Sequence, residues 1–428
     1  MRNKAYSGFV DRHYRPKPTD LITELYIEPA KGIPFEQACS EAAAESSVGT
    51  WTDISTSTKR IEKQLKAKAF YIDKKNGIAK IAYPYSLFEE GNIPQALSSI
   101  AGNIYGMRSL RNLRMEDIDF PSKYMRSFKG PRYGIQGVRK ITKVKKRPLV
   151  GTIVKPKLGL TEKQHAKVAY DAWKGGCDLV KDDENLSSLQ FNKFGERVKE
   201  TLKLRDKAEK ETGERKFYMP NVTGETLQML KRAEYVKKQG CEYAMVDIIT
   251  CGWSALQTLR NENPGLILHA HRAGHGMFTE NPKQGMSMLT VAKISRLIGV
   301  DQIHVGAVVG KMKGGRREIQ LIGENIEKRI IQEHRTDHVL AENWGNLKPV
   351  FAVCSGGLHP GKTEALMDAM GKDIIIQMGG GIHGHPKGTV KGAAAARQSV
   401  DAIMEGFTLK EYAKTHKELG EALKKWGH

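Results

Sequence analysis

The chain has 428 residues, of which 27% are charged and 39% are apolar, and its formal net charge is +21. That length suffices for two domains with buried cores and excludes a small disulfide-stapled protein. The positive charge gives non-specific affinity for phosphate. However, the lysines are scattered among glutamates and no known nucleic-acid-binding module is present, so we expect no nucleic-acid partner.

The first 136 residues are predicted to form an α+β domain. The pattern over Leu21–Pro29 predicts a strand, and that over Phe35–Glu45 an amphipathic helix. Ala67–Tyr83 has the pattern of a hairpin, with Asn76-Gly77 as a strong turn signal. A basic stretch, Arg139–Arg147, leads into the second predicted domain, which spans residues 137–428.

From about residue 150 onward, short apolar runs alternate with longer segments of helical periodicity, such as Glu162–Lys174 and Thr226–Gln239. Eight such units favour a parallel (β/α)8 TIM barrel over an open doubly wound sheet. In that fold the catalytic groups collect at the C-terminal ends of the strands. The predicted strands are Gly151–Lys157, Cys177–Asp183, Phe217–Thr223, Tyr243–Ile249, Leu266–Arg272, Gln302–Ala307, Val350–Gly356 and Ile374–Gly380.

The second of these strands ends in one lysine and three carboxylates. Because side chains alternate along a strand, Lys181 and Asp183 should share one face and Asp182 the other. Glu184 could turn back beside Asp183, and two such carboxylates would suit a hard cation such as Mg²⁺. Lys181 fits as a further ligand only if CO₂ converts its neutral amine into a negatively charged carbamate. For this motif alone, a structural salt-bridge cluster is the alternative.

Polar or glycine residues also stand at the ends of five other predicted strands. An ion pair or a tight turn explains any one of these ends, but it does not predict polar residues at so many. The pattern therefore indicates an enzyme. The residues are Lys155 and Lys157 on the first strand, His269, His271 and Arg272 on the fifth, His304 on the sixth, Ser355-Gly356-Gly357 on the seventh and Gly379-Gly380-Gly381 on the eighth.

The glycine-rich turns after the seventh and eighth strands indicate a phosphate site, because their backbone N–H groups can cradle an anion. Arg272 with His304 could hold a second anionic group. Two anion sites flanking a metal predict a small bisphosphate as substrate. After the sixth strand, Val309–Gly315 places Lys311 between glycines, so this loop could close over the site and bring a cation to it. An ordinary basic surface loop is the alternative.

Taken together, these segments resemble the large subunit of ribulose-1,5-bisphosphate carboxylase/oxygenase (Rubisco). The resemblance covers nearly the whole chain in the right order. The short length and the His383-Gly-His385 motif are most similar to the archaeal type III group. The matching segments are Glu45-Ser-Ser-Val-Gly-Thr-Trp-Thr52, Gly102-Asn-Ile-Tyr-Gly106, Gly151-Thr-Ile-Val-Lys-Pro-Lys-Leu-Gly159, Gly175-Gly-Cys-Asp-Leu-Val-Lys-Asp-Asp-Glu184, His269-Ala-His-Arg-Ala-Gly-His275, Ile303-His-Val-Gly-Ala-Val-Val-Gly-Lys311 and Ser355-Gly-Gly357.

The resemblance implies a ferredoxin-like first domain and a carboxylase. It implies that CO₂, or O₂, is added to the magnesium-bound enediol of ribulose 1,5-bisphosphate, and carboxylation then gives two molecules of 3-phosphoglycerate. Lys181 as carbamate, with Asp183 and Glu184, would bind Mg²⁺, and the carbamate would remove the C3 proton. Lys155 and His271 would transfer protons. Lys311 would stabilise the new carboxylate when its loop closes.

The resemblance also implies how the substrate is held. Arg272 and His304 would bind one phosphate and the eighth-strand glycines the other. Glu45 and Asn103 would come from a neighbouring subunit, so a homodimer, alone or in a higher oligomer, would be the minimal active unit, with no small subunit. The expected substrate-binding residues are Lys157, Arg272, His304, Ser355, Gly356, Gly357, Gln377, Gly379, Gly380, Thr50, Trp51, Asn103 and Glu45.

Two alternatives to a carboxylase have to be weighed. A Rubisco-like protein would have the same fold but would enolise or isomerise another phosphorylated sugar. Such proteins alter several site positions, whereas this chain keeps the carboxylase residues named above; a nucleic-acid-binding protein is the remote alternative. One departure is Ile153, where plant-type subunits have threonine, which separates the chain from the plant form. Type III resemblance implies a role in nucleotide-ribose salvage.

The cellular location is expected to be the cytoplasm. No signal peptide opens the chain, and no apolar run approaches membrane-spanning length, so we expect no membrane partner. The five cysteines are far apart, odd in number and without a CxxC motif, and several lie in apolar strand patterns. Buried free thiols in a reducing compartment are therefore expected.

Overall fold

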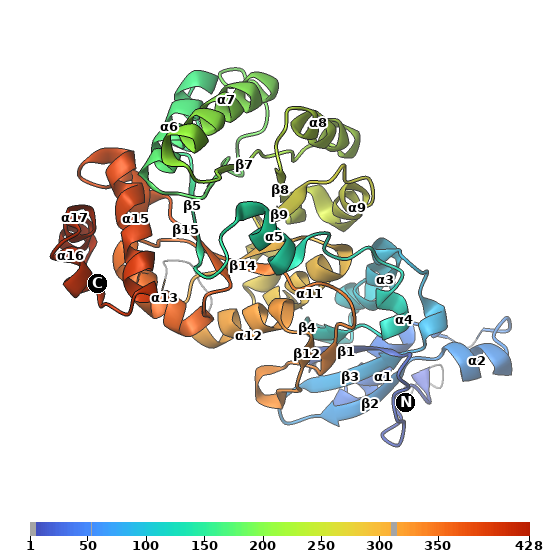
Figure 1. Ribbon diagram of the computed structural model, residues 1–428. Helices are drawn as coiled ribbons and strands as arrows, with labels where there is room; N and C mark the ends of the chain where they lie inside the picture. Colours follow the sequence, from blue (N-terminus) through green and yellow to red (C-terminus); the bar gives the residue numbers. More distant parts are fainter. Residues whose placement is uncertain (1–5, 53, 310–314) are drawn as a thin grey trace. The chain divides into compact units, whose positions relative to one another are not determined.

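The structure is a computed structural model that describes residues 6–52, 54–309 and 315–428. The chain divides into two compact units, whose elements are labelled in Figure 1. Unit 1 consists of Met1–Lys129, Gly274–Ile298 and Lys328–Leu347. Unit 2 consists of Gly130–Ala273, Gly299–Glu327 and Lys348–His428. Two segments that lie between barrel strands in the sequence therefore belong to unit 1.

Unit 1 is built on a five-stranded sheet with the order β10-β4-β1-β3-β2. Strands β1 to β4 pair in antiparallel fashion, and β10 pairs with β4 in parallel. With helices α1 and α3, these strands follow the β-α-β-β-α-β order of a ferredoxin-like domain. The elements are β1 (Leu21–Pro29), α1 (Phe35–Glu45), β2 (Lys68–Asp73), β3 (Ile78–Tyr83), α3 (Ile93–Ile100), β4 (Leu110–Asp119) and β10 (Gly285–Met286).

The elements predicted for this unit are confirmed, and their local chemistry explains them. Strand β1 and helix α1 have the predicted bounds. The predicted hairpin is β2 and β3, and its turn is fixed by Gly77, whose φ of 72° favours glycine. The Asn76 side chain donates to Asp73 Oδ2 at 2.7 Å, which closes the turn from the other side.

Unit 2 contains an eight-stranded parallel sheet with the order β7-β6-β5-β15-β14-β11-β9-β8. Its two ends meet, because Met245 of β8 bridges to the residues just after β7: Met245 N donates to Pro220 O and Val222 N donates to Met245 O. The sheet is thus a closed barrel, as predicted. Its strands are β5 (Leu149–Ile153), β6 (Leu179–Lys181), β7 (Phe217–Met219), β8 (Tyr243–Asp247), β9 (Ile267–His271), β11 (Gln302–Gly306), β14 (Phe351–Ser355) and β15 (Ile374–Gln377).

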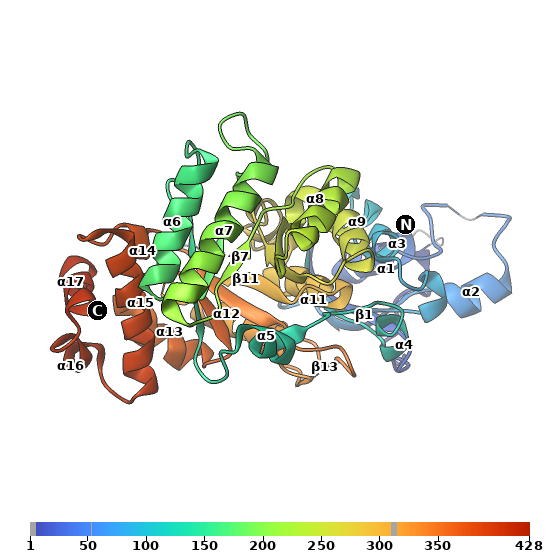
Figure 2. The ribbon, with the colours of Figure 1, turned by 45° about the horizontal axis from the view of Figure 1, so that its top comes forward.

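Helices surround the barrel strands, as Figure 1 shows for α6, α7, α8 and α9. Helix α6 begins with a capping box between Thr161 and Gln164, and α7 ends at Gly213 in the left-handed conformation. Near the C-terminus, α16 and α17 lie beside α15 in both views (Figure 2). The helices are α5 (Gly134–Thr142), α6 (Glu162–Gly175), α7 (Phe194–Thr212), α8 (Thr226–Lys238), α9 (Ile248–Asn261), α12 (Arg316–Glu327), α13 (Thr363–Met370), α14 (Gly380–His383), α15 (Gly388–Met404), α16 (Leu409–Ala413) and α17 (Lys417–Trp426).

The barrel interior is a packed core, and the charged side chains of the candidate site lie toward the C-terminal strand ends. Leu179, Met219, Met245 and Val353 fill its middle and are fully buried. All five cysteines are free thiols, and four of them are buried, as predicted. Among the described residues, no helix is both long and apolar enough to cross a membrane.

Candidate active site

The alternation predicted for the second barrel strand is confirmed. Lys181 lies on the inner face of β6, where its Nζ atom contacts Met245 Sδ of the core at 3.4 Å. Asp182 points the other way, toward the surrounding helices, where Arg197 Nε donates to its Oδ2 at 3.1 Å and Tyr218 OH to its Oδ1 at 2.6 Å. One strand thus directs a lysine into the barrel mouth and a carboxylate into the packing behind it.

Asp182 is therefore a stability residue, and its replacement should be costly. Burial acts to raise the pKa of Asp182, but the Arg197 charge and the contacts from His165 and Tyr218 outweigh it and hold the pKa far below its usual value. Asp182→Asn leaves the Arg197 guanidinium buried without its carboxylate, at a cost of about 3 kcal/mol of unfolding free energy. Urea denaturation measures this loss.

The matched control is Asp171→Asn, which removes the half-buried i,i+4 partner of the exposed Lys167 and should cost less than about 0.5 kcal/mol. Because the folded pKa of Asp182 is lowered, its contribution is complete above the unfolded pKa of about 4. It should be lost as the pH falls below that value. Equal costs for the two variants at neutral pH would contradict a buried, ionised Asp182.

The Lys181 amine is buried, and this burial favours its neutral form over the ammonium ion. Its side chain is only 1% exposed, and Nζ donates to Asp182 O at 2.8 Å and lies 3.9 Å from Glu184 Oε2. Burial is the largest influence on the pKa of Lys181 and lowers it, although Glu184 and Asp183 act in the opposite direction. A lower pKa increases the fraction of neutral amine, which is the nucleophilic form.

Lys155, from the segment after β5, is brought to the same place. Its Nζ donates to Asp183 Oδ2 at 2.7 Å, while Asn185 donates to Asp183 Oδ1 at 3.0 Å. Burial acts to raise the pKa of Asp183, but these hydrogen bonds outweigh it and lower the pKa. Asp183 is therefore held as an anion beside an ammonium group, in reach of Glu184 and Lys181.

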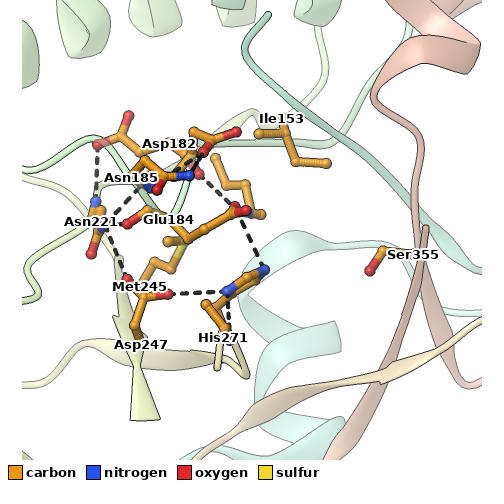
Figure 3. Close-up of polar contacts among 12 residues, drawn as sticks. Ile153, Asp182, Glu184, Asn185, Asn221, Met245, Asp247, His271 and Ser355 are labelled. Carbon is orange, nitrogen blue, oxygen red and sulfur yellow. Dashed lines mark hydrogen bonds and ion pairs between the residues drawn. The ribbon is translucent and has the colours of Figure 1, made fainter. Parts of the chain in front are cut away.

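Two further residues, Asn221 and Asp247, complete this cluster and were missed in the sequence. Asn221 Nδ2 donates to Glu184 O at 3.2 Å and to Asp247 Oδ2 at 3.3 Å. Asp247 Oδ1 lies 3.0 Å from His271 Nδ1, and His271 Nε2 lies 3.7 Å from Glu184 Oε2 (Figure 3). Both residues lie at the ends of predicted strands, so the alternation applied to Lys181 would have found them.

A second chain of hydrogen bonds crosses the barrel beneath the mouth. His269 Nδ1 contacts Gln302 Oε1 at 2.8 Å, His269 Nε2 contacts His304 Nε2 at 2.9 Å, and His304 Nδ1 contacts Ser355 Oγ at 2.8 Å. Burial lowers the pKa of His269 to about 3 and that of His304 well below its usual value. Both shifts favour the neutral form of the ring.

The positive charge for an anion on this side must come from elsewhere, and Arg272 is placed for it. A Cβ atom on Gly306 would lie 2.9 Å from Arg272 Nη2, so the guanidinium rests against the end of β11. Lys157 is exposed beyond the end of β5.

The glycine turns after β14 and β15 lie against each other. Gly356 and Gly357 have φ values of 107° and 77°, which favour glycine. A Cβ atom on Gly381 would lie 2.3 Å from Leu358 O, and one on Gly379 would lie 3.4 Å from Lys155 Cε. The two turns thus form one backbone surface next to Lys155, as a phosphate site requires.

The remaining predicted site residues lie elsewhere. Gln377 is 1% exposed and its amide has no hydrogen-bond partner among the described residues; it lies over Gly151 inside the barrel. Glu45, Thr50, Trp51 and Asn103 belong to unit 1. Lys311 lies outside the described residues.

The donor set fits a magnesium site only after Lys181 is modified. No group of three or more His, Cys, Asp and Glu side chains suited to a metal occurs in the described parts of the chain. Asp183 and Glu184 supply two carboxylates, which is few for a hard cation. A carbamate on Lys181, 3.9 Å from Glu184 Oε2, would add the missing anionic oxygens.

Comparison with known proteins places this site in a family. The catalytic-domain profile described as "Ribulose bisphosphate carboxylase large chain, catalytic domain" matches residues 134–426, and the corresponding N-terminal-domain profile matches residues 8–124. The chain belongs to the Rubisco large-chain family. It is thus an enzyme of the carboxylase family, and the resemblance inferred from its motifs is confirmed.

Archaeal Rubiscos are among the relatives of this chain. The ribulose bisphosphate carboxylase of Methanosarcina barkeri is 51% identical over 98% of both chains, and that of Pyrococcus abyssi is 48% identical over 100% of this chain and 98% of its own. The dimeric archaeal Rubisco of Hyperthermus butylicus superposes with a TM-score of 0.94 at 47% identity, covering 99% of both chains. The octameric Rubisco of Pyrococcus horikoshii gives 0.91 at 47% identity, covering 99% and 97%.

Proposed function

We propose that this Rubisco adds CO₂, or O₂, to the enediol of ribulose 1,5-bisphosphate, and that carboxylation gives two molecules of 3-phosphoglycerate. The observation that carries the proposal is the buried amine of Lys181, 3.9 Å from Glu184 in a barrel mouth that also holds Asp183, Lys155 and His271. A structural ion-pair cluster does not require a lysine whose pKa is lowered by burial. Carbamylation requires a neutral amine, and burial of Lys181 favours that form.

Different residues of the cluster carry out different proton transfers in this proposal. Mg²⁺, held by Asp183, Glu184 and carbamylated Lys181, would polarise the substrate oxygens and favour enolisation. Lys181, once converted to the carbamate, would accept the C3 proton. His271 Nδ1 lies 3.0 Å from Asp247 Oδ1 and also accepts from Ala273 N at 3.2 Å, and these contacts orient the ring so that Nε2 faces the mouth, where it can exchange a proton with the substrate. Lys155 is placed to return a proton to the cleaved product.

The substrate is held at both ends in this proposal. Arg272 supplies the charge for one phosphate, with His304 as a neutral hydrogen-bonding partner. The Gly379 and Gly380 turn, beside Lys155, receives the other phosphate on backbone N–H groups. Ser355, whose Oγ is hydrogen-bonded to His304, contacts the sugar backbone between them.

The competing function is a Rubisco-like enolase or isomerase of another phosphorylated sugar. Such an enzyme needs the enolising cluster but not the groups that act after CO₂ has added. The presence of Lys311 and the Asp247–His271 pair supports the carboxylase. Incorporation of labelled CO₂ into acid-stable product, with ribulose bisphosphate and Mg²⁺, tests the choice. Proton exchange at C3 without incorporation would favour the isomerase.

Lys311→Ala should separate the two halves of the reaction. Lys311 is proposed to meet negative charge that develops only once CO₂ has added. The variant should lose carboxylation by about 10²-fold or more but still exchange the C3 proton of ribulose bisphosphate with solvent. Measuring both rates on one preparation is the test. Equal losses in proton exchange and carboxylation would assign the lysine another role.

We also propose a homodimer, alone or within a larger assembly, in which Glu45, Thr50, Trp51 and Asn103 complete the barrel site. The solved relatives named dimeric and octameric support a dimer or a higher oligomer. A role in nucleotide-ribose salvage rests on the archaeal type III resemblance. Growth on ribonucleosides, compared between wild-type cells and cells lacking this enzyme, tests that role.

A further inference from the structure

A cavity lies in unit 2 at the end of the barrel opposite the catalytic cluster. Its volume is about 810 Å³, within the range of small-molecule sites. Arg147 and Asp178, which line it, directly precede β5 and β6, so the cavity borders the N-terminal strand ends. We call it the barrel-floor cavity. It takes in the basic stretch 143–147, whose charge the proposed catalysis does not use.

The guanidinium groups of this cavity are already paired. Arg147 donates to both Asp178 oxygens at 2.7 Å, and Arg215 Nε donates to Glu209 at 2.7 Å. Arg397 Nη2 lies 3.3 Å from Glu214 Oε1. The three acids of the lining are thereby neutralised, and any net charge in the cavity comes from its lysines.

Four lysines around the cavity lack such partners. Lys143, Lys145, Lys146 and Lys210 are exposed, and none forms an ion pair with an acid in the described portions of the chain. Helices α5 and α7 end beside them, and each helix C-terminus carries roughly half a negative charge. The two helix ends together carry roughly one negative charge, and the four lysine charges exceed it by about three. Neutralising the helix ends therefore does not account for the lysines.

The backbone at Lys143 also points to a use for its side chain. Its φ is 62°, in the left-handed region, and only one other non-glycine residue among those described, His338, shares that sign. Glycine would take this position, just after α5, without strain. Lys143 therefore adopts a backbone conformation that residues with a side chain disfavour, which is typical of positions whose side chain has a role.

We propose that the barrel-floor cavity binds a small molecule carrying two or more phosphate groups. Ammonium groups are effective point charges for phosphate, and the apolar side chains of Val144 and Met404 line the same cavity and can contact an organic part. The four lysines are grouped around one cavity, which favours a compact anion over the continuous phosphate backbone of RNA. The site is independent of catalysis, and its ligand does not compete with the substrate.

Inorganic tripolyphosphate is the probe, used with the assembled full-length enzyme. Acetylation of lysines, read by mass spectrometry, reports each site separately, so binding at the catalytic end does not obscure the result. We expect protection of Lys143, Lys145, Lys146 and Lys210 by tripolyphosphate. Lys203 is the control because it is exposed on the same helix as Lys210, two turns away, and does not line the cavity. Its acetylation should not change.

The test variant is Lys143→Gly/Lys145→Ala/Lys146→Ala. Glycine at position 143 removes the charge while relieving the backbone, so thermal stability should not fall. Protection of Lys210 should need about 30-fold more tripolyphosphate, taking about threefold per lysine as for exposed ion pairs. Lys203→Ala should leave the requirement unchanged. Unchanged protection in the triple variant, or equal protection of Lys203, would overturn the proposal. Protection by an RNA oligonucleotide but not by tripolyphosphate would replace it with a nucleic-acid surface.

Discussion

Replacing Lys181 with methionine is expected to lower CO₂ fixation by about 10³-fold or more and to remove activation by bicarbonate and Mg²⁺. Among the residues that the structure describes, only this amine lies buried between Asp182 O and Glu184 at the C-terminal end of β6, so it is the group placed to carry the carbamate. Methionine fills the buried position, whereas Lys181→Ala would also leave a cavity. Labelled CO₂ incorporation, with and without pre-incubation in bicarbonate and Mg²⁺, is the measurement.

The pH dependence of activation follows from the same environment. Because burial lowers the pKa of Lys181, the neutral amine is available at lower pH than for an exposed lysine. The activation rate should rise as the pH rises through that lowered pKa and should level off above it. The rise reflects loss of the proton that blocks reaction with CO₂.

Lys216→Met is the matched control for this experiment. Lys216 is likewise fully buried on the same barrel, and its Nζ donates to a backbone oxygen, Cys177 O, at 3.1 Å. It lies before β7 at the other end of the strands, so its loss should reduce stability and leave activation intact. Wild-type activity that is indifferent to pre-incubation, or activation that survives in Lys181→Met, would refute the carbamate assignment.

The sequence was sufficient to predict the barrel and the strand that carries this lysine. Eight apolar runs with turns between them define parallel strands, and alternation alone separates Lys181 from Asp182. Both predictions depend on near neighbours in the chain. The same holds for the β2–β3 hairpin, where Asn76-Gly77 determines the turn through local backbone geometry.

What the sequence could not provide are relations across the barrel. The Gln302–His269–His304–Ser355 chain joins three strands, and its effect, two neutral histidines, follows from burial that no local pattern reveals. His304 was expected to bind a phosphate together with Arg272, but the sequence did not show that burial lowers the pKa of its ring. The discontinuous unit 1 is a similar case. Strand β10 joins β4 of the first domain although it follows the fifth barrel strand in sequence.

A second prediction concerns assembly: when two inactive variants form mixed dimers, activity should be restored. If Glu45 and Asn103 of one protomer complete the barrel site of its partner, each site is divided between two chains. Lys181→Ala and Asn103→Ala are then each inactive alone. In a mixed dimer, one site inherits both substitutions and the other inherits neither. Random mixing makes about half of the dimers mixed, so about a quarter of the wild-type sites should return.

The experiment is co-expression of the two variants with different affinity tags, followed by isolation of the doubly tagged dimer and an assay of CO₂ incorporation. The isolated hybrid should have about half the activity of wild type, since one of its two sites is intact. Co-expression of Lys181→Ala with Lys311→Ala is the control: both residues lie in the barrel part of the sequence, so both sites of that hybrid stay defective. Confirmed Lys181→Ala/Asn103→Ala hybrids without recovered activity would mean that each site is formed by a single chain. The divided site would then have to be abandoned, while the carboxylase assignment would still stand on the Lys181 experiment.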